Sequence, residues 1–534
     1  MLFRVLPETM APDWWKLSAS AALVAVTLVV LWWRRYATKF SRAGVPSLPP
    51  LPVVGNMLDV VLSRKAMPEV VLDMYRHFQK HPYAGFYTFA KSLVLVRDPD
   101  LIRSITVKDF DHFTDHVDFL NTDKGHPVQQ RMLIFMKGKE WHDMRATLSP
   151  AFTSKKMRNM FLLIAEIGQQ VVEYITKECA KVEVPSGGNR VLTLEMKDLF
   201  TRVTNDVIAT TAFGVKVDSL AEPNNTFYTT GRELTTIKSG TVIGYMLVPR
   251  LMQLIGAQFV NMKAVEFFRT MLTETIKTRE EQGIVRHDMI HLMTQARRGE
   301  LEPEEGEANG TTDGKRRHLT DDDITAQALI FFIAGFDTVS TLLTFCSYLL
   351  ATNEDVQQRL QREVDELMQK SGGQPSYEQV LGCQYLDMVL SETLRMYTPL
   401  ASLDRTCVRS YRLPATESCP GLELRPGDGV WMPVLGIHYD PEYFPDPERF
   451  DPERFSPERK HLIKPFTYFP FGSGPRICIA QRFALMESKV VLVHLLSRFS
   501  LQVVARTPVP LRLQPDSATL TVRGGAWLGI RSRV

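Results

Sequence analysis

Apolar residues recur with a helical period along most of this chain. Spacings of three and four residues dominate from about residue 140 to 400 and again from 479 to 497, which predicts amphipathic helices. Short stretches of alternating apolar and polar residues, such as residues 92–97 and the tail after residue 511, predict strands. No internal repeat follows residue 52. The pattern predicts a mainly α domain with small β-sheets.

Residues 17–33 carry no charge. This length is near the lower bound for a helix that crosses a hydrocarbon layer of about 30 Å. Trp14 and Trp15 lie at one end and Trp32 and Trp33 at the other, as is typical of aromatic residues at membrane interfaces. A removed signal peptide is the alternative, but it needs small residues after the apolar stretch, and here Trp-Trp-Arg-Arg follows. We expect one retained N-terminal transmembrane helix.

The segments after this helix suggest how the chain is organised. Basic residues at the C-terminal end of the helix predict that the rest of the chain faces the cytosol. They are Arg34, Arg35, Lys39 and Arg42. Four prolines in residues 45–52 predict an extended, semi-rigid connection. We expect an anchor with its basic flank at 1–43, a proline-rich hinge at 44–56 and one large domain at 57–534. Glycosylation of the sequons at Asn224 or Asn309 would contradict the cytosolic orientation.

Composition narrows the class of protein further. The chain has 534 residues, 44% of them hydrophobic and 23% charged, which is ordinary globular usage. A net charge of +3 is too balanced for a broad nucleic-acid-binding surface, so we expect no nucleic-acid partner. The six cysteines contain no Cys-x-x-Cys pair, which argues against a zinc site or a disulfide scaffold and favours a reducing compartment. Residues 299–318 are polar and read as a solvated surface loop.

A long apolar helix is predicted after this loop. Thr320 followed by three aspartates is typical of a helix start. Residues 324–353 contain one charge, Asp337, so the segment is either a second membrane span or a buried core helix. A mid-membrane aspartate is costly, which favours the core helix. Asp337 and Thr338 after Gly335 are either a structural pair or a route for proton delivery into an apolar pocket.

One cysteine lies in a glycine-containing loop before another predicted helix. Residues 471–480 read Phe-Gly-Ser-Gly-Pro-Arg-Ile-Cys-Ile-Ala. The positive end of a helix favours a thiolate, which can ligate a metal, and Arg476 can hold an anionic group on the same side. The alternatives are a socket for a flat, anionic, iron-bearing cofactor and an ordinary buried cysteine.

At this loop the sequence resembles the cytochrome P450 family. The family's pattern Phe-x-x-Gly-x-Arg-x-Cys-x-Gly is matched by Phe471, Gly474, Arg476 and Cys478, while Ala480 replaces the last glycine. Further matches follow the order of the family's motifs. They are Trp141 and Arg145 of Trp-x-x-x-Arg, Ala334 to Thr338 of the acid-alcohol motif, Glu392 and Arg395 of Glu-x-x-Arg, and Arg454, with Arg449 as the other candidate for the same contact.

The resemblance implies a fold, a cofactor and a set of site residues. The fold is the cytochrome P450 fold behind a transmembrane helix, and the cofactor is haem b with Cys478 as the iron ligand. Asp337 and Thr338 are the implied catalytic residues, and Glu392, Arg395 and Arg454 the implied structural network. The implied haem-binding residues are Trp141, Arg145, Ala334, Thr338, Arg405, Phe471, Gly474, Arg476, Cys478 and Ala480.

The resemblance also implies a reaction. It is mono-oxygenation, in which one atom of O2 enters a lipophilic substrate while electrons from NADPH reduce the other atom to water. NADPH-cytochrome P450 reductase passes the electrons, with cytochrome b5 as a further expected partner. A thiolate-haem isomerase or dehydratase and a non-catalytic haem-binding protein are the alternatives, and relatives of the first kind tend to lose the acid-alcohol pair. The anchor is similar to that of microsomal forms, which implies the endoplasmic reticulum membrane, and the layout is most similar to insect family nine, relatives of the drug-metabolising family three.

The residues around the substrate are expected from family position. The implied walls of the substrate pocket are Phe113, Phe119, Phe331, Phe332, Phe336, Leu400, Ala401 and Leu520. Such a lining suits a xenobiotic, plant toxin or insecticide, although the same residues are as readily explained as core. The apolar segment 241–260 is either a lip in the bilayer or a buried helix pair. Arg131, Lys137 and Lys139 are candidates for contact with the reductase.

Overall fold

Helices make up most of the computed structural model, which describes residues 14–89, 91–119, 127–183, 190–236, 239–257, 261–286, 288–300, 319–517 and 519–533. Most of the predicted loop at 299–318, with Asn309, lies outside these residues. The longer helices are α1 (Trp14–Ala37), α4 (Met67–His77), α7 (Gly138–Leu148), α8 (Ser154–Lys181), α9 (Met196–Thr211), α10 (Thr226–Thr235), α13 (Met262–Gln282), α14 (Met289–Arg298), α15 (Asp321–Thr352), α16 (Glu354–Lys370), α18 (Gln384–Met396) and α20 (Gln481–Arg498).

Shorter helical segments connect these elements. They are α2 (Lys39–Arg42), α3 (Leu58–Val61), α5 (Pro99–Arg103), α6 (Pro127–Gln130), α11 (Ser239–Leu247), α12 (Pro249–Leu254), α17 (Tyr377–Leu381) and α19 (Val434–His438). Single turns of π- or 3-10 helix are η1 (Ser104–Lys108), η2 (Phe110–His112), η4 (Ser149–Phe152), η5 (Pro452–Phe455), η6 (Lys460–Leu462) and η7 (Gly474–Arg476).

The described strands form three small sheets. A four-stranded sheet has the order β1 (Tyr83–Thr88), β2 (Lys91–Val96), β7 (Gly429–Met432) and β4 (Leu403–Thr406). A second has the order β3 (Leu192–Glu195), β9 (Trp527–Ser532) and β8 (Phe499–Gln502), and a third pairs β5 (Tyr411–Leu413) with β6 (Leu422–Leu424). In the first sheet β2 runs parallel to β7, while β4 is antiparallel to β7 and pairs Arg405 with Val430. The prediction of a mainly α protein with small sheets is confirmed.

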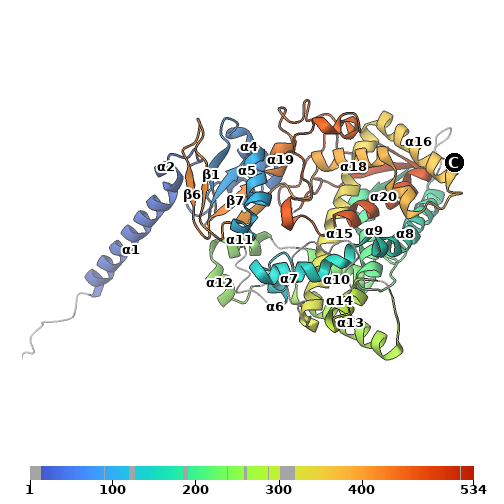
Figure 1. Cartoon of the computed structure of the whole chain (residues 1–534), viewed down its shortest axis with the longest axis horizontal. Helices are drawn as coiled ribbons and strands as arrows, with labels where there is room; N and C mark the ends of the chain where they lie inside the picture. Colours follow the sequence, from blue (N-terminus) through green and yellow to red (C-terminus); the bar gives the residue numbers. More distant parts are fainter. Residues whose placement is uncertain are drawn as a thin grey trace, which may run out of the picture.

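Helix α15 lies at the centre of the helical part (Figure 1). Its start is capped as predicted: Thr320 Oγ1 accepts the Asp323 N–H at 3.1 Å, and the Thr320 N–H donates to Asp323 Oδ2 at 3.0 Å. The helix is apolar enough to span a membrane, but 61% of its most apolar window is buried inside the protein. Because it packs against protein on most sides, the core-helix interpretation holds.

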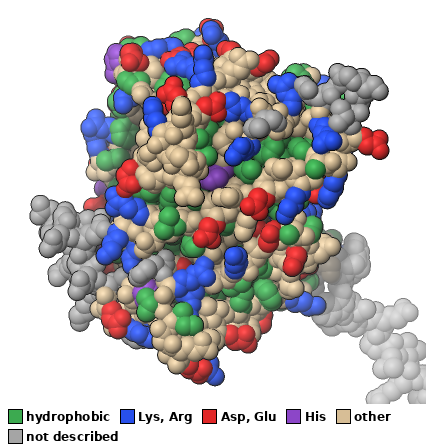
Figure 2. Space-filling model, turned by 90° about the vertical axis from the view of Figure 1, so that its right-hand side faces the viewer, with side chains coloured by type: hydrophobic (Ala, Val, Ile, Leu, Met, Phe, Trp, Pro, Cys, Tyr) green, Lys and Arg blue, Asp and Glu red, His purple; other side chains and the backbone are tan. Residues whose placement is uncertain are grey.

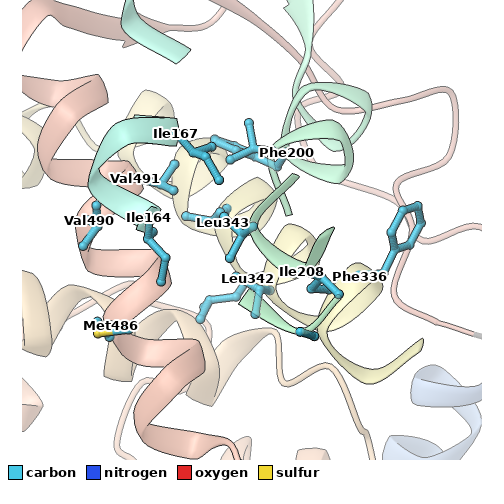
Figure 3. Close-up of a cluster of buried hydrophobic side chains, with 14 of the residues drawn as sticks. Ile164, Ile167, Phe200, Ile208, Phe336, Leu342, Leu343, Met486, Val490 and Val491 are labelled. Carbon is cyan, nitrogen blue, oxygen red and sulfur yellow. The ribbon is translucent and has the colours of Figure 1, made fainter. Parts of the chain in front are cut away.

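The main core is built where four helices meet. Figure 3 shows this cluster, in which α8, α9, α15 and α20 contribute aliphatic side chains, Met486 and two phenylalanines. The labelled members are Ile164, Ile167, Phe200, Ile208, Phe336, Leu342, Leu343, Met486, Val490 and Val491. This packing fixes α15 and α20 relative to each other. Helix α15 carries Asp337 and Thr338, and α20 begins three residues after Cys478.

The N-terminal helix stands apart from the rest. Helix α1 projects away from the side of the molecule where α2 and the four-stranded sheet lie (Figure 1). Its apolar part, Ser18–Ala37, is 0% buried in the protein, so it is a candidate membrane anchor. The proline-rich segment that follows lies along β1, where the Gly85 N–H donates to Pro46 O at 2.7 Å. The hinge at 44–56 stays a prediction.

On the face shown in Figure 2, Lys and Arg side chains are interspersed with Asp and Glu side chains.

Candidate haem site

The cysteine loop connects the turn η7 to helix α20. The Cys478 N–H donates to Phe471 O at 2.9 Å, which closes the loop on itself. Gly474 has a φ of +72°, and a Cβ at this position would lie 1.7 Å from Thr106 O, so only glycine fits. Phe471 and Ala480 are half-buried against the main core. Ala480 is the residue just before α20.

Cys478 differs from the other five cysteines, all of which are described. Those five are buried, whereas Cys478 is exposed. Protein atoms nevertheless surround its thiol closely, and this burial is the largest influence on the thiol and raises its pKa. The Ala480 backbone and the Arg145 charge lower the pKa, but less strongly. The backbone at the helix start therefore favours the thiolate, as expected, but desolvation of the thiol has the larger effect on the pKa.

Arg145 of α7 and Arg405 of β4 lie close to Arg476 of this loop. Arg476 donates from Nε to Thr114 O and from a terminal nitrogen to Met136 O, both at 2.8 Å. Arg145 donates to Ile477 O at 2.7 Å. Arg405, 1% exposed, donates to Asp404 O at 2.6 Å, and its Nε has no partner among the described residues.

The electrostatics of the three arginines indicate an anionic ligand. Burial lowers the pKa of Arg405 to about 10 and that of Arg476 to about 9, and the charges of Arg405 and Arg145 further lower the latter. Asp115 Oδ1 lies 3.7 Å from Arg476 and offsets part of this charge. Clustered buried cations with an unused donor fit an anionic group such as a haem propionate. Together with the accessible thiol of Cys478, these residues fit haem.

Trp141 packs against the arginines beside the cysteine loop. It is 3% exposed, and the Arg476 guanidinium lies 3.9 Å from the centre of its ring. Arg145 is farther from the same ring, at 5.9 Å. Trp141 therefore supports Arg476 through a cation–π contact.

The acid and the alcohol of α15 lie on different faces of the helix. Thr338 is half-buried and donates to Ala334 O at 2.6 Å, and both lie on one accessible face, one turn apart. Asp337 Oδ1 instead lies 2.8 Å from Lys197 Nζ of α9, and its other carboxylate oxygen has no partner within the part of the chain that the structure describes. Lys197 Nζ also contacts the oxygens of Ser340 and Thr341 at 2.8 and 2.7 Å.

Lys197 is a residue of this site that the sequence did not indicate. It lies in the first turn of an amphipathic helix, where a lysine is ordinarily solvated, and it is 140 residues from its partner. No local signal distinguishes it from other surface lysines.

The predicted structural network is closed and buried. Arg395 donates to both carboxylate oxygens of Glu392, at 2.7 and 2.9 Å, and Arg454 Nε lies 3.2 Å from the same carboxylate. Glu392 and Arg395 are 0% exposed and Arg454 is 6% exposed. Arg449 is exposed and contributes its carbonyl oxygen, 3.4 Å from Arg395. Arg454, not Arg449, supplies the second cation.

The residues expected around the substrate divide into two groups. Phe113 and Phe332 are 0% exposed: Phe113 packs against Tyr411, and Phe332 packs against Phe213. For these two the expectation of a pocket lining is wrong, because they fill the core. Phe336 and Leu520 also lie largely in the core, at 3% and 4% exposed. Accessible surface remains at Phe119, Phe331, Leu400 and Ala401.

Comparison with known proteins agrees with this geometry. The sequence profile of the family "Cytochrome P450" matches residues 45–526. Cytochrome P450 9e2 of Blattella germanica is 46% identical over 531 residues, covering 97% of this chain and 98% of the relative. Cytochrome P450 6k1 of the same organism is 37% identical, covering 95% of each chain, and cytochrome P450 9c1 of Drosophila melanogaster is 36% identical, covering 92% of this chain and 94% of the relative. With a profile match across nearly the whole chain and a cysteine loop of fitting geometry, this protein belongs to the cytochrome P450 family of haem-thiolate monooxygenases.

Proposed function

We propose that this protein is a membrane-anchored monooxygenase that oxidises lipophilic small molecules, such as plant toxins, insecticides and other xenobiotics. Haem b is the family's cofactor, and a reductase supplies electrons from NADPH. The observation that carries the proposal is the accessible Cys478 beside the buried Arg405 and Arg476 and the half-buried Arg145. Among the described residues, the Arg405 Nε has no hydrogen-bond partner.

We assign Cys478 as the iron ligand and Arg145, Arg405 and Arg476 as the residues that hold the propionates. When bound, haem supplies oxygen activation, which a thiolate ligand favours by donating electron density to the iron. Metal binding also offsets the raised pKa of Cys478, because a coordinated thiol is deprotonated.

We assign Thr338 and Asp337 of α15 to proton handling during the reaction. The Thr338 hydroxyl lies on the accessible face of α15, where it can hold a water molecule next to Ala334. Asp337 is bound to Lys197, so it reaches the Thr338 face only through a change of rotamer or a bridging water. Lys197 is accordingly part of the proposed relay.

A membrane-facing surface near α1 supports entry of lipophilic substrates. Helices α11 and α12 lie on the same side of the molecule as α1 in Figure 1. Large apolar side chains are 46% to 84% exposed there, which favours a lip in the bilayer over a buried helix pair. They are Val248, Leu251, Leu254 and Ile255. We propose the endoplasmic reticulum membrane as the location, with the basic flank and the large domain on the cytosolic side.

We propose NADPH-cytochrome P450 reductase as the electron donor, with cytochrome b5 as a second partner. Of the three candidate cations, Arg131 is bound to the fully buried Asp323 at 2.8 Å and supports the start of α15. Lys139 is 76% exposed and pairs with Asp143 at 3.1 Å, so it is the best placed for docking. Lys139→Glu is expected to slow reduction by the reductase and to weaken its salt dependence.

A carbon-monoxide difference spectrum of the reduced full-length protein, followed by product analysis with reductase and NADPH, tests the proposal. We expect the absorbance band typical of thiolate ligation, spin-state shifts with lipophilic ligands and NADPH-dependent oxygenated product. Product without NADPH would indicate an isomerase, and haem binding without turnover a carrier. Loss of the band in Cys478→Ser is the matched control.

A further inference from the structure

A buried histidine connects the Glu392 network to the cysteine loop. His438, the last residue of α19, is 0% exposed. Its ring stacks on Tyr468 with centroids 5.4 Å apart and lies edge-on to Phe469. No motif of the sequence analysis includes it.

The hydrogen bonds of the ring define its protonation. The Phe469 N–H donates to His438 Nε2 at 3.2 Å, so this nitrogen carries a lone pair. Nδ1 lies 3.1 Å from Arg395 O, which only accepts, so Nδ1 carries the proton. The ring is therefore a neutral tautomer that accepts one hydrogen bond from Phe469 and donates one to Arg395.

Both ends of this bridge belong to parts of the haem site. On one side, Arg395 also donates from a terminal nitrogen to His438 O at 2.8 Å, so α18 and α19 are bound twice. On the other side, Phe469 O accepts the Gly472 N–H at 3.0 Å and starts the turn that leads to Cys478. Phe471 lies within that turn and its carbonyl accepts the Cys478 N–H at 2.9 Å, so a shift at Phe469 would be transmitted to the cysteine.

We propose that His438 is a positioning residue for the Cys478 thiolate: its Nε2 fixes the first turn of the cysteine loop to the Glu392–Arg395–Arg454 network. It does not contact the reacting atoms. Its effect is on where the sulfur lies and therefore on how firmly the thiolate is kept as the ligand. The inference rests on haem ligation by Cys478.

Two amide substitutions separate the two hydrogen bonds. In His438→Gln the side-chain oxygen can reach the Nε2 position and accept the Phe469 N–H. In His438→Asn the shorter amide can donate to Arg395 O from the Nδ1 position but cannot reach Phe469. Tyr468→Phe is the matched control, because it keeps the stacked ring and loses only the bond from its hydroxyl to Ser391 O.

The readout is the fraction of reduced carbon-monoxide complex that keeps the thiolate band, measured with the rate of haem loss and the urea midpoint. We expect His438→Asn to shift the equilibrium toward the thiol-ligated form by roughly tenfold, or ~1.4 kcal/mol. His438→Gln and Tyr468→Phe are expected to stay close to the unmodified protein. Equal thiolate fractions in both amide variants, whatever their urea midpoints, would overturn the proposal.

A second measurement does not depend on whether the asparagine variant folds. Hydrogen exchange of the Phe469 amide in the unmodified holoprotein is expected to be as slow as in α18. Exchange at the rate of exposed loops would overturn the proposal. Absence of the thiolate band from the unmodified protein itself would instead contradict the proposed function.

Discussion

Arg395 and Arg405 are both buried, at 0% and 1% exposed, yet they are bonded very differently. Arg395 binds both oxygens of Glu392 and donates to the carbonyls of His438 and Pro447, each at 2.8 Å. Arg405 has one hydrogen bond, to its neighbour's carbonyl, and an unused Nε among the described residues.

This difference in hydrogen bonding distinguishes an arginine that stabilises the fold from one that binds a ligand. A buried cation whose nitrogens all donate holds elements of the fold together, here α18, α19 and the segment around Pro447. A buried cation with an unused donor costs stability until an anion arrives. The role of a buried motif arginine therefore has to be inferred from its hydrogen bonds, because burial by itself does not distinguish a structural role from a ligand-binding one.

The largest effect is expected from Glu392→Gln. The substitution leaves Arg395 and Arg454 in the core without a counter-charge, which costs about 3–5 kcal/mol. We expect little folded protein and a sharply lower urea midpoint. A urea midpoint close to that of the unmodified protein would show that Arg395, like Arg405, does not depend on a protein counter-charge.

Acid is expected to lower the free energy of unfolding through His438, which is bound to Arg395. Burial and the Arg395 charge lower the pKa of His438 to about 3, from about 6.5 when unfolded. The unfolded chain therefore binds the proton first, and stability present above pH 6.5 is lost as the pH falls toward 3, by about 2 kcal/mol at pH 5. Tyr468, stacked on the ring, stays neutral because burial raises its pKa. Urea unfolding at several pH values should give a flatter dependence in His438→Gln.

Arg405→Leu is expected to have opposite effects on the fold and on haem. Removing an incompletely bonded charge should leave the unfolding free energy of the haem-free protein unchanged or higher. Haem affinity should fall roughly tenfold, or ~1.4 kcal/mol, as one propionate contact is lost. Transfer of haem to an acceptor globin measures the affinity, and Arg412→Leu, at an exposed arginine, is the control. Lower stability with unchanged haem retention would make Arg405 structural.

The smallest effect is expected at the Asp337–Lys197 pair. Lys197→Met leaves the Asp337 carboxylate without its cation, so we expect product per NADPH to fall several-fold and peroxide release to rise. Thr338→Ala should give the same uncoupling, while Lys197→Arg keeps the ion pair and most of the coupling. Undiminished coupling in both Thr338→Ala and Lys197→Met would show that protons reach the site by another route.

Local patterns predicted much of this molecule. The capped start of α15 and the exposed apolar helix near the N-terminus were predicted from spacing and residue type. So was strand β2 (Lys91–Val96), which was expected at residues 92–97. The Glu392–Arg395 pair follows from a spacing of three on one helix. Other features could not be predicted in this way. Phe332 and Phe331 are adjacent in sequence, yet one fills the core and the other keeps accessible surface.

The cysteine loop, the long apolar helix and the motif residues follow from local sequence, because each depends on neighbours within a few positions along the chain. Packing between distant elements selects the arginine that completes the Glu392 network, and it brings Asp337 to Lys197 and His438 to Phe469. These contacts join residues from 31 to 140 positions apart. Which of these residues meet depends on how helices and sheets pack against one another, and residue spacing along one element carries no information about that packing.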